Sequence, residues 1–437
     1  MSNILKYFNT RNSYELSFFR EGDPLALNYF KIIRIFMVAP GAWPADVFGE
    51  KLSLLVRVHR ALMPYHTSVI VIGELYYLYI HKEELDFLNM GHMIIFSFLG
   101  VLIAIRSILP QLRKYHLLLT KFVKVMHLMH FKNKGPYYKQ INETVDKISY
   151  YYTIFVALLV TTAMINFNIV PLFNNVTNVL IYKTENFTLE FALYYKYPGF
   201  DPLDYFTSTT IYNVYLSYNC SIMVSGIDLI LFLIIFQIIG HVYILRYNLE
   251  NFPSPKIKVV FKLKEILKHK GNEDISSEMF DAEENREVRL KLQECIEHHK
   301  LIIGFTDELS ELFGPILAIN YFFHLVCCSL LLLECSEGGA WIRYGPLTVV
   351  IYGQLIQMSV IFEMLGSETE KLPDSAYFLP WECMDTSNRR TACIMLHKMQ
   401  YKISLKALGL AAVGVSTMTG ILKTTFSYYA FLQTMGE

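Results

Sequence analysis

Long runs of hydrophobic residues recur along this chain and are separated by shorter polar segments. A helix needs about 20 consecutive apolar residues to cross a hydrocarbon core of about 30 Å. We therefore expect an all-α membrane protein with seven transmembrane helices, with an amphipathic helix at 386–403 before the last of them. The predicted spans are 53–80, 87–112, 149–172, 208–245, 302–334, 342–365 and 411–435.

The chain offers no obvious place to divide it. Neither an internal repeat nor a Gly-rich or Pro-rich linker interrupts the pattern, so residues 1–437 are expected to form one domain. Within this domain, 53–385 contain spans 1–6, and 386–437 contain the amphipathic helix and the last span. Residues 1–20 lack the apolar core of a signal peptide. Only 433–437 follow the apolar run that ends at Leu432, so we expect any output to leave through the loops or the last helix itself.

Composition agrees with a lipid environment. Hydrophobic residues make up 53% of the chain and charged residues 18%, whereas a soluble domain carries about 25% charged residues. The net charge is zero. We expect membrane lipid as a partner and no nucleic acid.

Lysine and arginine are distributed unequally between alternate loops. They are frequent before span 1 and in 106–147, 256–291 and 371–406. The segments on the opposite side contain only Lys82, Lys183, Lys196 and Arg343. Because positive residues stay in the cytosol, this distribution predicts a cytosolic N-terminus and an extracellular C-terminus.

That orientation is inverted relative to G-protein-coupled receptors. Span 3 opens with Ser149-Tyr150-Tyr151 and has no DRY-like end, and span 7 has no NPxxY-like turn. A receptor of that class signalling through a second messenger remains an alternative, as does a carrier. Carriers often show broken helices or paired repeats, and neither is visible here.

Two sequons lie in the predicted outer loop after span 3, at Asn175 and Asn186, and we expect glycosylation there. A third sequon, at Asn142, lies on the cytosolic side and should stay unmodified. Of the seven cysteines only Cys335 lies clearly in an outer loop, so no disulfide framework is expected.

Spans 4 and 5 are longer than a membrane requires. A helix over 208–245 would extend about 58 Å at 1.5 Å per residue, and the helix around span 5 would begin near Glu283. The charge distribution places the parts of both helices that extend beyond the membrane in the cytosol. We expect them to pack with 386–403 into a helical bundle where subunits meet.

No catalytic motif is present, so we expect neither an enzyme nor a cofactor. There is no G-x-x-x-x-G-K-[ST] loop, no H-E-x-x-H and no Cys-x-x-Cys pair. His298 and His299 are adjacent, but adjacent helical residues point about 100° apart, so they do not predict a metal site.

Charged residues deep inside a span are pointers to function, and Glu74, Asp228 and Lys423 lie in spans 1, 4 and 7. Such residues either face the bundle interior as structural polar groups or mark an ion path. The structural interpretation is favoured for Glu74 and Asp228. A direct contact between these two would require a shared proton or a cation.

The C-terminal third carries the most specific motifs. PWECMDTSNRR at 380–390 leads into a charged helix, followed by SLKALG at 404–409 and STMTGILKTTFSYY at 416–429. These motifs resemble the insect odorant receptor family, with its Trp before a charged helix and its "ILK…SYSY" last helix. GHVYIL at 240–245 and CIEHHK at 295–300 extend the resemblance, and Tyr429-Ala430 departs from it. The 380–390 stretch looks most like the moth pheromone-receptor branch.

The resemblance implies a ligand-binding subunit of a ligand-gated, non-selective cation channel. Members of the family assemble with a shared odorant receptor co-receptor into heterotetramers in the plasma membrane of olfactory neuron dendrites. The last helix of each subunit lines a central pore. Expected ligands are long-chain unsaturated acetates, aldehydes or alcohols, and a receptor for general plant volatiles is the alternative.

Helical geometry then places the pore face. At about 100° per residue, one side of the last helix carries hydroxyl and apolar residues within about 50° on either side of its centre. Lys423 lies about 120° from that side. The expected pore-lining residues are Thr417, Ile421, Thr424, Tyr428 and either Phe431 or Leu432. The alternative is that this face packs on a neighbouring helix.

The family places its ligand site among the outer halves of spans 2, 3, 4 and 6. Methionine and aromatic side chains there would suit a hydrocarbon chain, and tyrosine hydroxyls could bind a polar head group. Helix–helix packing is the alternative role for each. The expected ligand-binding residues are Phe87, Met90, Met93, Thr161, Met164, Phe167, Tyr212, Tyr215, Met223, Tyr352 and Leu355.

Overall fold

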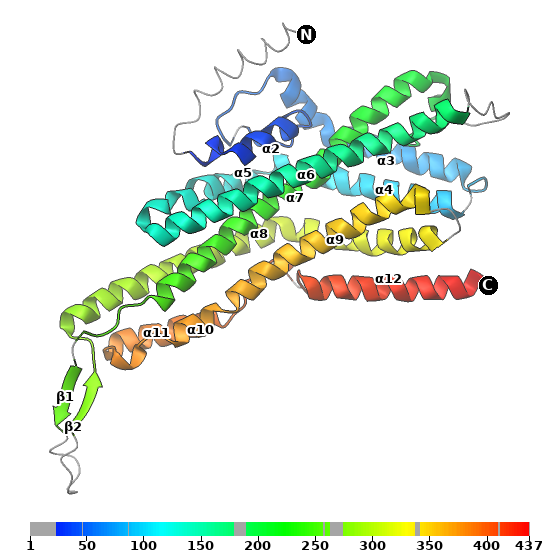
Figure 1. Cartoon of the computed structure of the whole chain (residues 1–437). Coiled ribbons are helices and arrows are strands. Elements are labelled where there is room, and N and C mark those ends of the chain that lie inside the picture. Colours follow the sequence, from blue (N-terminus) through cyan, green and yellow to red (C-terminus); the bar gives the residue numbers. More distant parts are fainter. Residues whose placement is uncertain are drawn as a thin grey trace.

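The computed structural model of this chain describes residues 23–45, 47–85, 87–178, 189–256, 258–262, 274–336, 341–409 and 411–436. Almost all of the described chain is helical, as predicted. The long helices run side by side in one elongated bundle (Figure 1). In order, the long helices are α3 (Leu54–His81), α4 (Phe87–Ile108), α6 (Pro136–Val176), α7 (Phe206–Glu250), α8 (Ala282–Ser336), α9 (Trp341–Thr369) and α12 (Val415–Gly436).

Shorter elements complete the bundle. They are α2 (Asn28–Val38), α5 (Arg113–Lys121), α10 (Leu372–Tyr377) and α11 (Thr386–Met399), with two small hairpins, β1–β2 (Lys258–Lys262, Asp274–Glu278) and β3–β4 (Lys406–Ala407, Ala411–Ala412). Five helical segments are long and apolar enough by themselves to cross a membrane. Those five begin at Met90, Pro136, Pro202, Ala282 and Leu347, and α3 and α12 complete the seven.

Local sequence explains where several helices begin. The hydroxyl of Ser53 accepts a hydrogen bond from the backbone N–H of Val56 and so caps α3. Asp385 caps α11 in the same way, at 2.7 Å from the N–H of Asn388. Helix α6 begins with Pro136 at its first position, where the missing N–H costs nothing.

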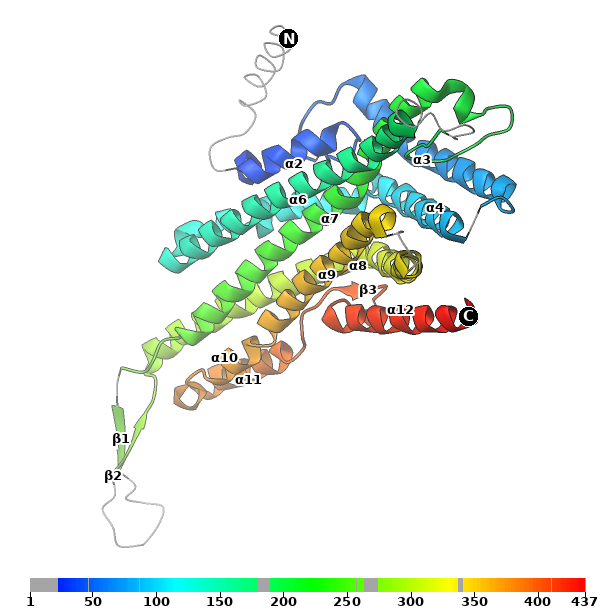
Figure 2. The same cartoon turned by 45° about the vertical axis from the view of Figure 1, so that its right-hand side comes forward.

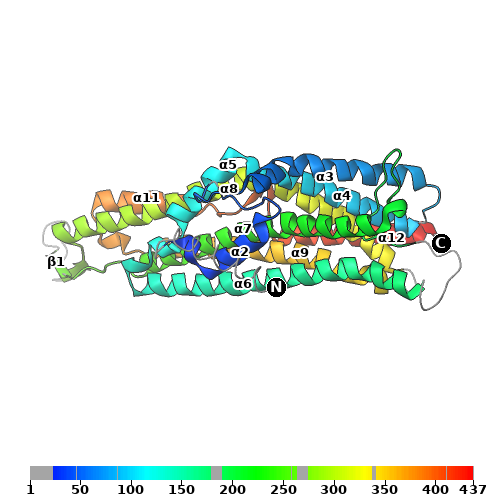
Figure 3. The ribbon, with the colours of Figure 1, turned by 90° about the horizontal axis from the view of Figure 1, so that it is seen from above.

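Helix α7 lies at the centre of the bundle. In its most apolar stretch 89% of the residues are buried, whereas in the most apolar stretch of α6 only 11% are buried. A helix that is hydrophobic on every side must be covered on every side, while α6 turns most of its apolar surface outward. Figure 3 shows α7 running between α6 and α4 along the length of the molecule.

At the end of the molecule that carries β1 and β2, α7 and α8 extend past the other long helices (Figure 2). Helix α11 packs against the first part of α8, and α10 packs against α7. The predicted bundle of long extensions with the 386–403 segment is therefore present. The bundle contains Asn388, whose side-chain amide donates to the backbone carbonyl of Asn285 at 2.8 Å.

Two sequence predictions need correction. Helix α6 begins at Pro136, so the predicted span 149–172 understates it, because polar residues such as Asn142 occupy its first turns. The apolar run from Ala411 is not helical from its start. Ala411 and Ala412 pair with Lys406 and Ala407 as a hairpin, and α12 begins only at Val415.

Candidate functional site

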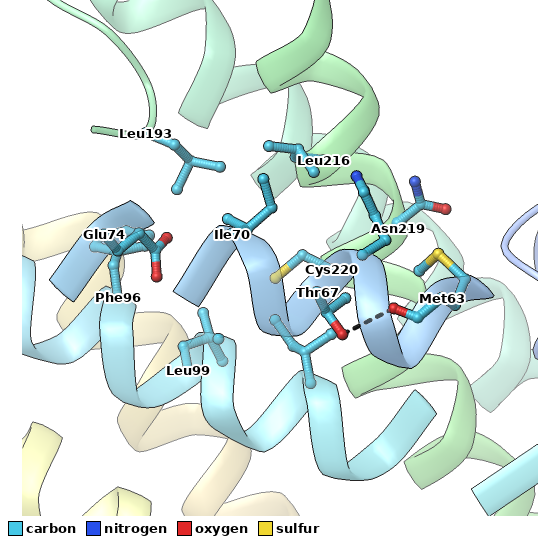
Figure 4. Close-up of a pocket in the computed structure, with 13 residues that line it drawn as sticks. Met63, Thr67, Ile70, Glu74, Phe96, Leu99, Leu193, Leu216, Asn219 and Cys220 are labelled. Carbon is cyan, nitrogen blue, oxygen red and sulfur yellow. Dashed lines mark hydrogen bonds between the residues drawn. The ribbon is translucent and has the colours of Figure 1, made fainter. Parts of the chain in front are cut away.

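The site is a pocket between α3, α4 and α7 (Figure 4). The pocket is partly open, and its empty space, counted together with the solvent at its mouth, is about 470 Å³. Its surface is mostly apolar, which is typical of ligand sites. The lining residues are Met63, His66, Thr67, Ile70, Glu74, Phe96, Leu99, Gly100, Ile103, Leu193, Leu216, Asn219 and Cys220.

Helix α3 supplies one long wall. The pocket residues from Met63 to Glu74 recur at helical spacing, so they share one face of α3. Eleven residues correspond to about 16 Å along a helix. The pocket is therefore elongated along α3.

Pro64 stands inside α3, where it cannot donate a backbone hydrogen bond. The carbonyl of Arg60, which would have accepted that bond, instead accepts one from the side-chain amide of Gln111 at 3.1 Å. The hydroxyl of Ser68 donates to the Pro64 carbonyl at 2.7 Å. Helix α3 is thus continuous at the inner end of the pocket.

The segment before α7 covers the outer end of the pocket. Leu193 lines the pocket, and the carbonyl of Leu193 accepts a hydrogen bond from the side-chain amide of Asn213 at 3.2 Å. The Tyr197 hydroxyl donates to the Val69 carbonyl at 3.0 Å, and the N–H of Lys196 donates to the Gly73 carbonyl at 3.1 Å. This segment is therefore attached to α3 by two hydrogen bonds.

A glycine makes this close approach possible. A Cβ at Gly73 would lie 2.6 Å from the ring of Tyr197, a distance that real side chains do not show. Beside it, Lys196 and Asp201 form an ion pair at 2.8 Å. The hydrogen bond from Lys196 lowers the pKa of the Asp201 carboxyl.

Two tyrosines predicted to bind ligand lie next to the pocket. The hydroxyl of Tyr212 is hydrogen-bonded to Nε2 of His66, a lining residue. The hydroxyl of Tyr215 is hydrogen-bonded to Nε2 of His59 at 2.5 Å. Both hydroxyls therefore bind histidines of α3, and neither tyrosine lines the pocket.

Phe167 stacks on the lining residue Phe96, with ring centroids 5.3 Å apart. Met93 and Met223 are buried, and Thr161 donates to the backbone carbonyl of Ala157 at 2.7 Å. Met90 and Met164 are half-buried, and the side chain of Phe87 lies outside the described residues.

Tyr352 and Leu355 lie on α9. Leu355 is fully buried, and the Tyr352 hydroxyl donates to the carbonyl of Cys328 on α8 at 3.1 Å. None of the predicted ligand residues lines the pocket, so a ligand role for them remains a prediction. Sequence reasoning did not predict that α3 lines the pocket. The helical spacing of Met63, Ile70 and Glu74 does indicate that they share one face of that helix.

Helix α12 packs against α8 and α9 with one face and leaves the other uncovered. Ile421 and Thr425 are buried on the packed face, and the hydroxyls of Thr425 and Ser329 lie 3.5 Å apart. Thr417 and Thr424 are half-buried, Tyr428 is exposed, and the side chain of Leu432 lies outside the described residues. Lining of a pore by these residues remains a prediction.

The uncovered face of α12 is centred elsewhere than expected. Gly420, Lys423 and Ser427, which follow one another at helical spacing, are all exposed. Lys423 therefore lies in the middle of the surface that α12 offers to lipid, water or another subunit. Ile421, by contrast, points into the same chain.

The half-buried Asp228 has a partner within the bundle. An Nη1 of Arg106 lies 2.9 Å from Oδ1 of Asp228, and the same nitrogen donates to the Val224 carbonyl at 2.6 Å. Arg106 was assigned to a cytosolic loop from the sequence, and this was wrong, because its side chain is fully buried on α4. The ion pair supports the structural interpretation of Asp228.

The two expected glycosylation sites differ. Asn175 is 6% exposed, its side-chain amide donates to the Glu190 carbonyl at 2.8 Å, and its side-chain oxygen accepts from the Glu190 N–H at 2.7 Å. A glycan on that nitrogen would break this pair, which argues against modification of Asn175. Asn186 lies outside the described residues, and its modification remains a prediction.

Comparison with known proteins identifies the family. A family model described as "7tm Odorant receptor" matches residues 85–426. Odorant receptor 85c of Drosophila melanogaster is 23% identical over 147 residues, which are 33% of this chain and 38% of that protein. Odorant receptor 10 of Aedes albopictus is 23% identical over 155 residues, which are 35% of this chain and 41% of that protein. The matched part thus spans about two fifths of these relatives' length.

Solved structures share the whole fold. The insect olfactory receptor OR5 from Machilis hrabei matches 92% of this chain and 97% of its own, with a TM-score of 0.70 and 13% identity. The structure of OR5 in complex with eugenol matches 93% of this chain and 96% of its own, with a TM-score of 0.69 and 12% identity. These relatives are receptors and not enzymes. Since the family match covers well over half of the 437 residues, this multi-pass membrane protein belongs to the insect odorant receptor family.

Proposed function

We propose that this chain is the ligand-binding subunit of a ligand-gated, non-selective cation channel that forms a heterotetramer with the shared odorant receptor co-receptor in the plasma membrane. The observation that best supports this proposal is that the rest of the chain covers only one face of α12. A helix that lines a pore between subunits must leave one face free. The family match provides the context for this reading.

The proposed pore path uses the threonines and Tyr428 of α12. On α12, Tyr428 is exposed and Thr424, one helical turn before it, is half-buried. Small hydroxyls beside apolar constrictions suit a cation path that closes by dewetting. Lys423 would repel cations on the axis. In this proposal Lys423, which lies in the middle of the uncovered face, therefore meets a neighbouring subunit or lipid, and the side of that face with Thr424 and Tyr428 borders the path.

The proposed ligand is a small hydrophobic odorant in the pocket between α3, α4 and α7. Long-chain unsaturated acetates, aldehydes or alcohols fit an elongated apolar space, as moth pheromones do. Among the residues expected from the sequence, Tyr212, Tyr215 and Phe167 would act through the pocket residues that they contact. A receptor for general plant volatiles is the second candidate, since such ligands share this chemistry.

Opening requires a ligand that binds the open form more tightly than the closed form. A ligand between α3, α4 and α7 would shift the position of α7, which packs on α8 and α9. Both α8 and α9 pack on α12. This chain of contacts provides a route from the pocket to the pore without a nucleotide or a G protein.

The test is whole-cell current in cells that express this chain with and without the co-receptor, with G-protein signalling blocked. We expect a fast cation current only with the partner, evoked by long-chain acetates, aldehydes or alcohols. Thr424→Val should change ion selectivity, while Thr419→Val, a matched substitution on the same helix, should not. A response that disappears under the G-protein block would contradict the channel mechanism.

A further inference from the structure

The pocket contains one carboxyl group that nothing in the described chain satisfies. Glu74 is 3% exposed, and within the described residues its carboxyl oxygens have neither a hydrogen bond nor a cation within ion-pair distance. Figure 4 shows the carboxyl group pointing from α3 into the space beside Ile70 and Leu99. A buried polar group without a partner costs free energy, so its presence at a cavity wall needs an explanation.

The surrounding structure holds this carboxyl group in place. Gly100 on α4 faces it, and a Cβ at Gly100 would lie 3.1 Å from Oε2 of Glu74 and 2.7 Å from Cγ2 of Val71. The glycine thus makes room for the carboxyl group between α3 and α4. Phe96, Leu99 and Ile103 of α4 also line the pocket, so the α4 wall beside Glu74 is apolar.

The chemistry of these surroundings decides which ligand head group fits. An ionised carboxylate would need donors for both oxygens, and the described residues supply none. A cationic amine would create a buried ion pair whose second carboxylate oxygen stays unpaired, and such a pair rarely repays its desolvation. A neutral carboxyl group instead donates one hydrogen bond, as ligand carbonyl and hydroxyl oxygens require.

We propose that Glu74 is a specificity-determining residue of the receptor: as a neutral carboxyl group, it donates a hydrogen bond to the oxygen of an aldehyde, ester or alcohol, whose hydrocarbon chain extends along α3 toward Met63. This inference rests on the proposed function and deepens it by naming the residue that binds the oxygen of the ligand. It differs from the sites expected on the sequence, which placed the ligand without α3.

The test measures binding to the purified full-length chain in nanodiscs, as the ligand-induced rise in the unfolding temperature. The probes share one chain length: decanal, decyl acetate, decane and decylamine. We expect decanal and decyl acetate to bind the native chain more tightly than decane. Glu74→Leu should reduce that preference roughly tenfold, the effect of one buried neutral hydrogen bond.

Three further variants make the result specific. Glu74→Gln keeps an N–H donor and should keep the preference for oxygenated ligands. Glu74→Met is a second, more flexible apolar variant that serves if Glu74→Leu does not fold. Glu334→Leu removes a buried carboxyl group of α8 that does not line the pocket, and it should leave the preference unchanged.

Two results would overturn the inference. One is an unchanged preference for decanal over decane in both apolar variants. The other is tightest binding of decylamine by the native chain and its loss in Glu74→Gln, which would indicate a carboxylate that binds cations. Because binding is measured without current, a chain that binds as expected but conducts nothing contradicts only the proposed channel function.

Discussion

Arg106 on α4 and Asp228 on α7 form an ion pair in the interior of the bundle, with Nη1 and Oδ1 2.9 Å apart. Arg106 is fully buried, and its Nε and second Nη have no partner within the described residues. A charge in this position is stable only while its partner is present. The pair therefore joins α4 and α7, and replacing either residue alone would leave the other without its charged partner.

Removing one member of this pair should be more harmful than removing both charges. Asp228→Asn should destabilise the folded chain by about 3–5 kcal/mol, because Arg106 would keep an unpaired buried charge. The double variant Arg106→Gln/Asp228→Asn should recover part of that loss. Thermal unfolding in detergent and surface expression measure both effects, and equal losses in the single and double variants would contradict the pairing.

Acidification should destabilise the region around His127. Burial, together with the neighbouring His130 and His241, lowers the pKa of His127 from its ordinary 6.5 to about 3. The unfolded chain binds the proton more readily, so stability is complete above pH 6.5 and declines as the pH falls toward 3. At pH 5 this one group should cost about 2 kcal/mol.

His127→Gln tests this expectation. Nε2 of His127 lies 2.7 Å from the Tyr29 hydroxyl, and glutamine can hydrogen-bond to that hydroxyl without titrating. The variant should show a smaller decline in unfolding temperature between pH 7.5 and pH 5 than the native chain. His397→Gln, on α11, serves as the matched control. An unchanged pH dependence in His127→Gln would exclude His127 as a source of the acid sensitivity.

Gly73 and Tyr197 should be coupled. Gly73→Ala places a methyl group against the Tyr197 ring, so the covering segment must move, at a cost of about 1–3 kcal/mol. Tyr197→Leu should relieve part of that strain, and the double variant should be less destabilised than the sum of the two. Unfolding temperatures of the four chains measure the coupling. Gly420→Ala, where a Cβ meets open space, is the control.

Asn175 should behave as a structural residue. Asn175→Gln lengthens the side chain that binds both polar groups of the Glu190 backbone, so it should lower stability by about 1 kcal/mol or more. The electrophoretic mobility of the folded, surface-expressed chain should not change, because no glycan is expected there. A mobility increase matching the loss of one glycan would show that this asparagine is modified.

Periodic patterning predicted the helices well and their surroundings poorly. The seven spans and the 386–403 helix follow from apolar runs, and the packing of the latter on α8 follows from helices too long for a bilayer. Counting charges placed Arg106 in the cytosol, because a count cannot detect that Asp228 lies opposite it on another helix. Helix partners are a property of the fold and not of one segment.

The same limit applies to the candidate site. Glu74 stood out in the sequence as a charge within a span, but its role depends on Gly100 and Phe96 of the next helix. Tyr212 and Tyr215 were reasonable polar candidates. Their hydroxyls bind His66 and His59 instead, which only the relative rotation of α3 and α7 determines.

Helix α7 is continuous for 45 residues, from Phe206 to Glu250. Cys220 lines the pocket near one end, while Glu250, about 45 Å further along the helix, accepts a hydrogen bond from Ser375 of α10 near the other. A rigid rod transmits a tilt at one end as a displacement at the other. An odorant no larger than a few side chains could therefore move the distant helical bundle by leverage, with no contact to it.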